Sequence, residues 1–302
     1  MNGIIVVDKP AGCTSFDVVA VMRRLCGQRK IGHTGTLDPM ATGVLPLLIG
    51  CATRAAALLE DTDKEYEAGF RLGVSTDTQD ATGKIQARSG APAERSRVEE
   101  ALARFRGDIF QTPPMYSAVS VNGQRLYRLA RQGIEVERAR RPVRIDRLEL
   151  TAYDEAAREG TLSIRCSKGT YIRTLCSDLG DAIGTGGMMT ALRRTRAAGF
   201  TLEDAVTLDD ARELSARGRL RERLLPAELL FRNRPALGVT EAQARRFSNG
   251  GALGLARTAL KAENPEDGAV YRVLSPEGAF LGLGAVCTEK EELRVLRLFP
   301  EE

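Results

Sequence analysis

Residues 32–50 read GHTGTLDPMATGVLPLLIG, and this stretch holds a single carboxylate, that of Asp38. Small or hydroxylated residues precede Asp38, and an apolar run from Val44 to Ile49 follows it. Such a run predicts a segment buried in the core. A carboxylate beside a buried segment is costly to desolvate unless another group pairs with it. The stretch therefore raises the question of which group pairs with Asp38.

A candidate partner lies in residues 167–175, SKGTYIRTL. Apolar alternation over 161–166 predicts a strand, and the periodicity from Ile172 to Ile183 predicts a helix with Thr170 as its N-cap. Arg173 and Tyr171 lie at this junction, off the apolar stripe. A guanidinium fixes a carboxylate through two hydrogen bonds. A held carboxylate in a dry cleft suits attack on a sugar carbon or stabilisation of its cation. The residues alone leave open that Asp38 caps a turn and that Arg173 is a surface residue.

Other elements follow from periodicity and capping. Residues 3–9 and 66–74 are predicted strands. Thr14 or Ser15 is the predicted N-cap of a helix that ends at Gly27, and Ser96 with Glu99 predicts a capping box. From residue 235 onward, a short helix (240–247) and Gly-rich apolar strands predict a small β-rich domain. The chain is therefore expected to be an α+β protein with a large and a small domain.

Residues 111–142 interrupt this pattern. They are bounded by prolines and are expected to leave the sheet as an excursion, because long loops in compact domains are usually functional or disordered. Residues 122–147 carry eight arginines and three acids, a charge of 8 − 3 = +5, whereas the whole chain carries +4. Clustered arginines indicate a phosphate-bearing partner. A solvated charged face is the alternative.

The sequence lacks the residues that several classes of function require. The chain has one histidine, His33, and no CxxC pair, which argues against a zinc site. It has no GxxxxGK[ST] phosphate loop and no GxSxG nucleophile elbow. The six scattered cysteines predict reduced thiols in a cytoplasmic protein. No apolar run approaches the ~18 residues of a membrane helix, and the N-terminus does not read as a signal peptide.

Six motifs together resemble the bacterial tRNA pseudouridine-55 synthases of the TruB type. They are DKPAGCTSFDVV (8–19), GHTGTLDPMATGVLPLLIG (32–50), KEYEA (64–68), PPMYSAVSVNGQRLYRLARQG (113–133), SKGTYIRTLCSDLG (167–180) and LRRTRAAGF (192–200). The resemblance covers about residues 3–232. It implies a pseudouridine-synthase fold over 1–232, with a mixed, largely antiparallel sheet, flanking helices and an RNA-gripping insertion at about 111–142. Residues 235–302 resemble a PUA-type RNA-binding domain less closely.

The resemblance implies isomerisation of uridine to pseudouridine at position 55 of the tRNA T-loop, with base flipping and with no cofactor or metal. Asp38 matches the family's catalytic aspartate, which either bonds to C1′ or assists through the C2′ proton, and Arg173 matches its partner arginine. Four residues match substrate or RNA contacts: Tyr66, which packs on the target base, Tyr171 and Leu192, which line the uridine pocket, and His33. Lys9 and Pro10 match a motif that supports the Asp38 loop.

The implied partner is tRNA, bound through its T-arm and with its acceptor arm as a further contact. The protein is expected to act as a monomer, with no obligatory protein partner and no membrane. Two alternatives stay open. One is an RNA-binding or RNA-folding protein with an idle catalytic site, and the other is the RNA-guided branch of relatives, which needs protein partners.

Overall fold

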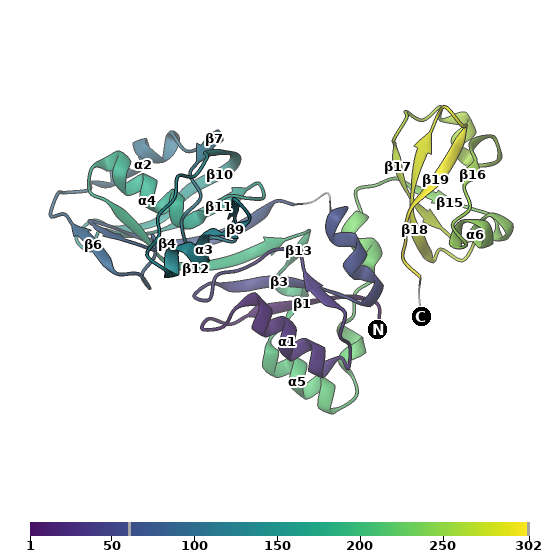
Figure 1. Ribbon diagram of the computed structural model, residues 1–302, viewed down its shortest axis with the longest axis horizontal. Coiled ribbons are helices and arrows are strands. Elements are labelled where there is room, and N and C mark those ends of the chain that lie inside the picture. Colours follow the sequence, from purple (N-terminus) through teal and green to yellow (C-terminus); the bar gives the residue numbers. More distant parts are fainter. Residues whose placement is uncertain (60–61, 301–302) are drawn as a thin grey trace.

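A ten-stranded sheet runs through the larger part of the computed structural model, which describes residues 1–59 and 62–300 (Figure 1). Its main path is β14 (Ala205–Val206), β1 (Gly3–Lys9), β3 (Thr42–Ile49), β12 (Gly187–Ala197), β4 (Lys64–Leu72), β11 (Glu159–Cys166), β10 (Arg141–Asp154) and β7 (Gly107–Gln111). β2 (Ile31–His33) pairs with β3, and β13 (Phe200–Thr201) pairs with β12. Among these described strands, β1 with β14 and β3 with β12 are parallel and the other pairs are antiparallel. The predicted mixed, largely antiparallel sheet is confirmed.

Four helices cover one face of this sheet. α1 (Ser15–Leu25) and α5 (Leu208–Ala216) lie against the β1 end, α4 (Ile172–Ile183) lies on β12 and β4, and α2 (Arg95–Ala103) lies beside α4 and β10 (Figure 1). Their apolar residues join one core with alternate residues of the strands, such as Ile5 and Val7 of β1. No helix in the described ranges has the length and apolarity that a membrane span requires.

The other face of β1 and β3 is also buried, which explains the unbroken apolar runs in these strands. Ile4 and Val6 pack there with Phe231, Phe280 and Phe299. The last two phenylalanines belong to the smaller domain, whose sheet has the order β15 (Ala236–Gly238), β17 (Val270–Leu274), β18 (Phe280–Cys287), β19 (Glu292–Leu298), β16 (Leu253–Gly254) and is accompanied by α6 (Glu241–Ser248). The predicted β-rich C-terminal domain is confirmed, and apolar side chains connect it to the main sheet.

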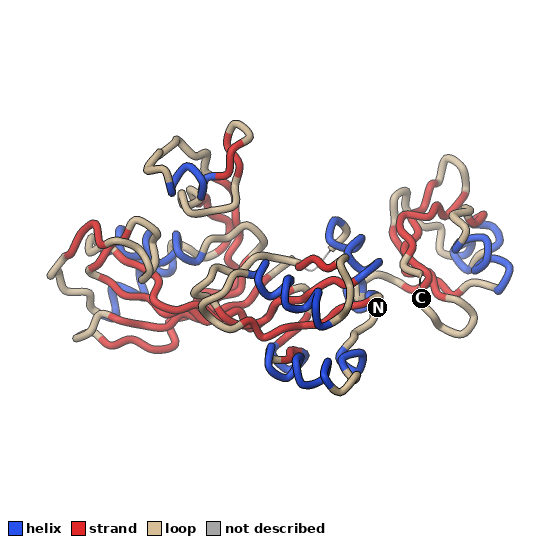
Figure 2. Tube along the Cα trace, turned by 60° about the horizontal axis from the view of Figure 1, so that its bottom comes forward, coloured by secondary structure: helices blue, strands red, loops and turns tan. Residues whose placement is uncertain are grey.

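The basic excursion leaves the sheet after β7 and returns at β10. Between them lie a small hairpin, β8 (Ser120–Val121) and β9 (Gln124–Arg125), and the short helix α3 (Leu126–Arg131). Figure 2 shows this segment standing away from the main sheet. A cavity of about 570 Å³ separates it from α4 and from β5 (Val74–Thr76), which pairs with β6 (Ile85–Arg88). The excursion is therefore attached to the sheet at its two ends, and open space lies between it and α4 and β5.

Three local predictions were wrong. α2 begins at Arg95 after Glu94, so Ser96 and Glu99 form no capping box. α4 has Tyr171 and not Thr170 as its N-cap residue, because the Thr170 hydroxyl donates to the carbonyl of Ser167. The strand predicted over 66–74 is divided into β4 and β5 at Gly73, which has a φ of +83°. In contrast, Thr14 caps α1 as expected, through a capping box with Asp17.

Candidate active site

Asp38 lies on the loop between β2 and β3, and the start of the chain fixes that loop. The Ser15 hydroxyl donates to the carbonyl of Leu37 (3.2 Å) and accepts from its N–H (2.8 Å). The Lys9 ammonium, which has no exposed surface, donates to the carbonyls of Ala41 (2.7 Å) and Pro39 (3.4 Å). Burial lowers the pKa of Lys9. These contacts hold the backbone on both sides of Asp38.

Arg173 contacts the Asp38 carboxylate at two points. Its Nε lies 2.9 Å from Oδ2, and its Nη2 donates to Oδ1 at 3.4 Å. The Arg173 side chain is 6% exposed and that of Asp38 is 36% exposed. The first turn of α4 thus presents a buried cation to a carboxylate that keeps one side open. This arrangement orients the carboxylate while leaving it accessible to a substrate.

Three further groups hold the Arg173 guanidinium. It donates to the carbonyls of Thr78 (3.2 Å) and Tyr116 (2.8 Å), and its Nε lies 3.8 Å from the carboxylate of Asp80. Asp80 is buried and accepts hydrogen bonds from Thr82 and Thr78. Since Tyr116 belongs to the basic excursion, Arg173 connects the excursion with the carboxylate.

The other predicted site residues lie around this pair. Tyr66, on β4, is 7% exposed, and burial is the main cause that raises its pKa to about 12, so it is a neutral phenol at physiological pH. Leu192, on β12, is buried in the same core as Tyr66 and faces Ala68 across the strands. Tyr171 immediately precedes α4 and is half-buried, two residues from Arg173.

His33 ends β2, five residues before Asp38. Its pKa is lowered, first by burial and then by the charge of Arg194, so the imidazole is neutral at physiological pH. Its Nδ1 is buried and has no hydrogen-bond partner among the described residues. His33 therefore offers an uncharged donor or acceptor near the loop.

Sequence reasoning missed three buried polar residues at this site. Asp80 supports Arg173, and Arg194 of β12 contacts the Asp38 loop. Gln111, at the end of β7, accepts from the N–H of Tyr171 (3.0 Å) and donates to its carbonyl (3.3 Å). Gln111 therefore joins the base of the excursion to the start of α4. A single glutamine between Phe110 and Thr112 gives no signal of this role.

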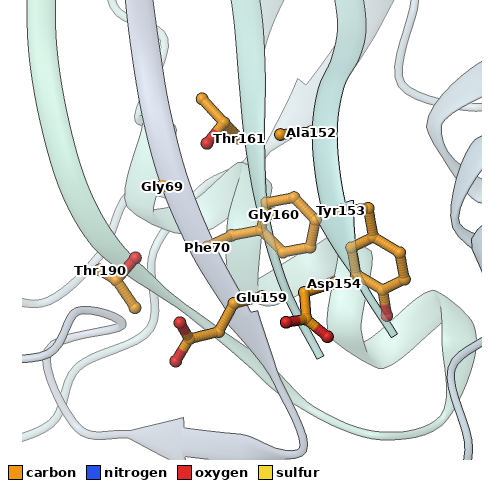
Figure 3. Close-up of a pocket in the computed structure, with 9 residues that line it drawn as sticks. All are labelled: Gly69, Phe70, Ala152, Tyr153, Asp154, Glu159, Gly160, Thr161 and Thr190. Atoms are coloured by element: carbon orange, nitrogen blue, oxygen red, sulfur yellow. The ribbon is translucent and has the colours of Figure 1, made fainter. Parts of the chain in front are cut away.

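A hollow of about 420 Å³ on the sheet contains none of the predicted site residues (Figure 3). Phe70, Tyr153 and the carboxylates of Asp154 and Glu159 line it. Within the described ranges, no group of three or more His, Cys, Asp or Glu residues is arranged to hold a metal ion. The Asp38 loop itself brings together an oriented carboxylate and buried guanidinium groups.

Asp178, on α4, should make the stability of the fold depend on pH. Burial raises its pKa to about 6 from 3.8, with the charge of Asp181 adding to the effect. Ionisation of Asp178 therefore lowers the free energy of unfolding progressively as the pH rises from 4 to 6. Above pH 6 this loss of stability stays at its full value. Asp178→Asn should raise the free energy of unfolding by ~1–2 kcal/mol at pH 7.5 and leave it unchanged at pH 4. Urea unfolding at both pH values measures this, with exposed Glu149→Gln as the control. An equal gain at both pH values would contradict the assignment.

Comparison with known structures supports the fold. A chain of a Cbf5–Nop10–Gar1 complex superposes with a TM-score of 0.74 at 24% identity, covering 99% of this chain and 85% of that one. A chain of an archaeal box H/ACA Nop10–Cbf5 complex gives a TM-score of 0.72, also at 24% identity, covering 99% of this chain and 86% of that one. The similarity includes both domains.

Sequence comparison identifies the family. Residues 23–172 match the N-terminal domain of the TruB family of pseudouridylate synthases, and residues 173–232 match the C-terminal domain of tRNA pseudouridylate synthase B. The tRNA pseudouridine synthase B of Heliobacterium modesticaldum is 48% identical over 252 residues, which cover 83% of this chain and 81% of that protein. The corresponding protein of Syntrophomonas wolfei is 42% identical and covers 99% of both chains. The chain therefore belongs to the TruB family of pseudouridylate synthases, isomerases that act on RNA.

Proposed function

We propose that this chain converts the uridine at position 55 of the tRNA T-loop into pseudouridine, alone and without a cofactor, with Asp38 as the catalytic carboxylate. The observation that carries the proposal is the Asp38 carboxylate, which buried Arg173 holds at two points while one side stays open. The choice of tRNA follows relatives that are named tRNA pseudouridine synthase B and match most of the chain.

The reaction keeps all atoms of the nucleotide. The N1–C1′ bond breaks, the uracil turns within the site, C5 bonds to C1′, and the proton that leaves C5 is balanced by one that N1 gains. Asp38 either attacks C1′ or takes the C2′ proton, and both roles require an ionised, fixed carboxylate. Arg173 supplies the fixation. The neutral Tyr66 phenol packs on the base and takes part in the C5 proton transfer, and Tyr171 and Leu192 line the pocket.

A base stacked in a folded loop must leave the stack first, at a cost of a few kcal/mol. We assign this step to residues 1–232, with His33 contacting the RNA and the excursion at 111–142 gripping the T-arm. Residues 235–302 form a PUA-like RNA-binding domain that contacts the acceptor arm. The enzyme acts as a monomer.

Tritium release from tRNA labelled with [5-³H]uridine tests the proposal. The purified chain alone should release tritium from an unmodified transcript in EDTA, and a transcript with cytidine at position 55 should release none. Release from both transcripts would overturn the assignment of position 55. Binding without release would favour an RNA-binding protein or a guided enzyme.

The arginines of the excursion should make the affinity for tRNA depend on salt concentration. Arg128 and Arg131 are exposed on α3 and flank the ring of Tyr127 (5.9 and 5.6 Å). If each neutralises one phosphate, Arg128→Gln and Arg131→Gln should each make the slope of log K against log salt shallower by roughly one. Filter binding of tRNA from 50 to 300 mM salt measures the slope. Arg212→Gln on α5 is the exposed control, and an unchanged slope in both excursion variants would contradict the proposed grip.

A further inference from the structure

Arg194 is the largest fully buried side chain of the protein's described part, with no exposed surface. It lies on β12, and among the described residues no carboxylate lies within ion-pair distance of it. Burial is the main cause that lowers the pKa of Arg194. Burying a cation without a counter-ion costs several kcal/mol, so stability alone does not explain this residue.

Three hydrogen bonds of the Arg194 guanidinium go to backbone carbonyls near Asp38. Its Nη2 donates to the carbonyl of Gly35 (3.0 Å) and its Nη1 to that of Thr36 (3.4 Å), both on the Asp38 loop. Its Nε donates to the carbonyl of Val44 on β3 (2.7 Å). The guanidinium thus joins the two backbone segments that precede and follow Asp38.

Tyr66 is the cross-strand partner of Arg194 on β4, so the two side chains lie on the same face of the sheet. On the other side of β12, Arg194 is paired with Gly43 of β3. There a side chain is excluded, since a Cβ at Gly43 would lie 2.1 Å from the Arg194 carbonyl oxygen. Arg194 is therefore fixed between the strand of Tyr66 and the strand that follows Asp38.

We infer that Arg194 is a positioning residue for the isomerisation: it joins the Asp38 loop to β3 and so holds the Asp38 carboxylate in place beside the strand of Tyr66. This inference rests on the proposed function. Arg194 touches no reacting atom and acts through the carbonyls of Gly35, Thr36 and Val44.

Arg194→Lys tests the inference, because lysine keeps the charge and loses the planar fork. The rate of tritium release from bound tRNA should fall roughly 100-fold, the loss expected for a small misplacement of reacting groups. The dissociation constant for tRNA should stay within about twofold.

Arg193→Lys is the matched control. Arg193 is the neighbouring residue on β12, points to the other face, and pairs with Asp8 at 2.8 Å. It should turn over bound tRNA at the wild-type rate. Arg194→Met is a second variant in case the lysine variant does not fold, because an apolar side chain removes the buried charge altogether. It should show the same rate loss.

Amide hydrogen exchange of residues 34–38 separates this inference from the proposed function. Exchange there should be faster in Arg194→Lys than in wild type and unchanged in Arg193→Lys. If wild type released no tritium, the proposed function would fail, while the exchange result would still report whether Arg194 holds the loop. A folded Arg194→Lys with wild-type turnover, or with a loss confined to tRNA affinity, would overturn the inference.

Discussion

Asp38→Asn should abolish pseudouridine formation, with a loss of ~10⁴-fold or more in the rate of the bound complex, and should leave tRNA binding nearly unchanged. Asparagine has the shape of aspartate, but its amide neither attacks a sugar carbon nor accepts a proton at neutral pH. The loop should keep its conformation, because Ser15 and Lys9 bind its backbone and not the Asp38 side chain. Binding of tRNA should persist, because we assign it mainly to the arginines of the excursion at 111–142.

Single-turnover tritium release and filter binding on the same preparation measure the two effects separately. Asp8→Asn is the matched control, because Asp8 is also a half-buried carboxylate held by an arginine, with Arg193 at 2.8 Å. It should lose little turnover. Full turnover in Asp38→Asn would show that Asp38 is not a catalytic residue. A loss of tRNA affinity with an unchanged rate in the bound complex would show that Asp38 only contacts the RNA.

Local sequence signals predicted the elements that surround Asp38 well. Thr14 and Asp17 specify the start of α1 by themselves, because both partners of the capping box lie within one helical turn. The apolar run after Asp38 predicts a buried segment, and the structure makes it the strand β3, which is covered on both faces. The motif around Arg173 placed this residue beside Asp38, although 135 residues separate the two in sequence.

Residues whose role depends on distant packing were not predictable. Asp80 lies in the polar stretch STDTQDATGK, which reads as a solvated turn, yet pairing of its neighbours with Met189 of β12 buries it. Arg194 is one of three arginines in LRRTR, and an arginine that is fully buried, with no carboxylate beside it in the described part of the chain, is too rare to be expected from a pattern. Thr170 failed as a cap because its hydroxyl donates to the carbonyl of Ser167, while Gln111, 60 residues before Tyr171, accepts from the N–H of Tyr171.

Arg173→Ala should remove turnover and also weaken the fold. It would release the Asp38 carboxylate and leave Asp80, which is 4% exposed, without its nearest cation. Removing one partner of a buried ion pair typically costs 3–5 kcal/mol. The hydrogen bonds that Asp80 keeps with Thr78 and Thr82 limit the loss, so we expect ~3 kcal/mol in urea unfolding.

The variant Arg173→Lys separates catalysis from stability. Lysine keeps a charge near Asp80 but does not reproduce the two-point contact with Asp38 or the hydrogen bonds to the carbonyls of Thr78 and Tyr116. We expect it to unfold close to the wild-type urea concentration and to turn over roughly 100-fold more slowly. Amide exchange around Tyr116 should also be faster, because the excursion loses its link to α4.

Arg272→Ala is the control for both Arg173 variants. Arg272 forms a partly buried ion pair with Glu228 at 2.6 Å in the C-terminal part of the chain, far from Asp38 in sequence. It should cost stability without slowing the reaction of bound tRNA. If Arg173→Ala were folded and turned over at the wild-type rate, the two-point contact would be structural only, and Asp38 would need another group to hold it during the reaction.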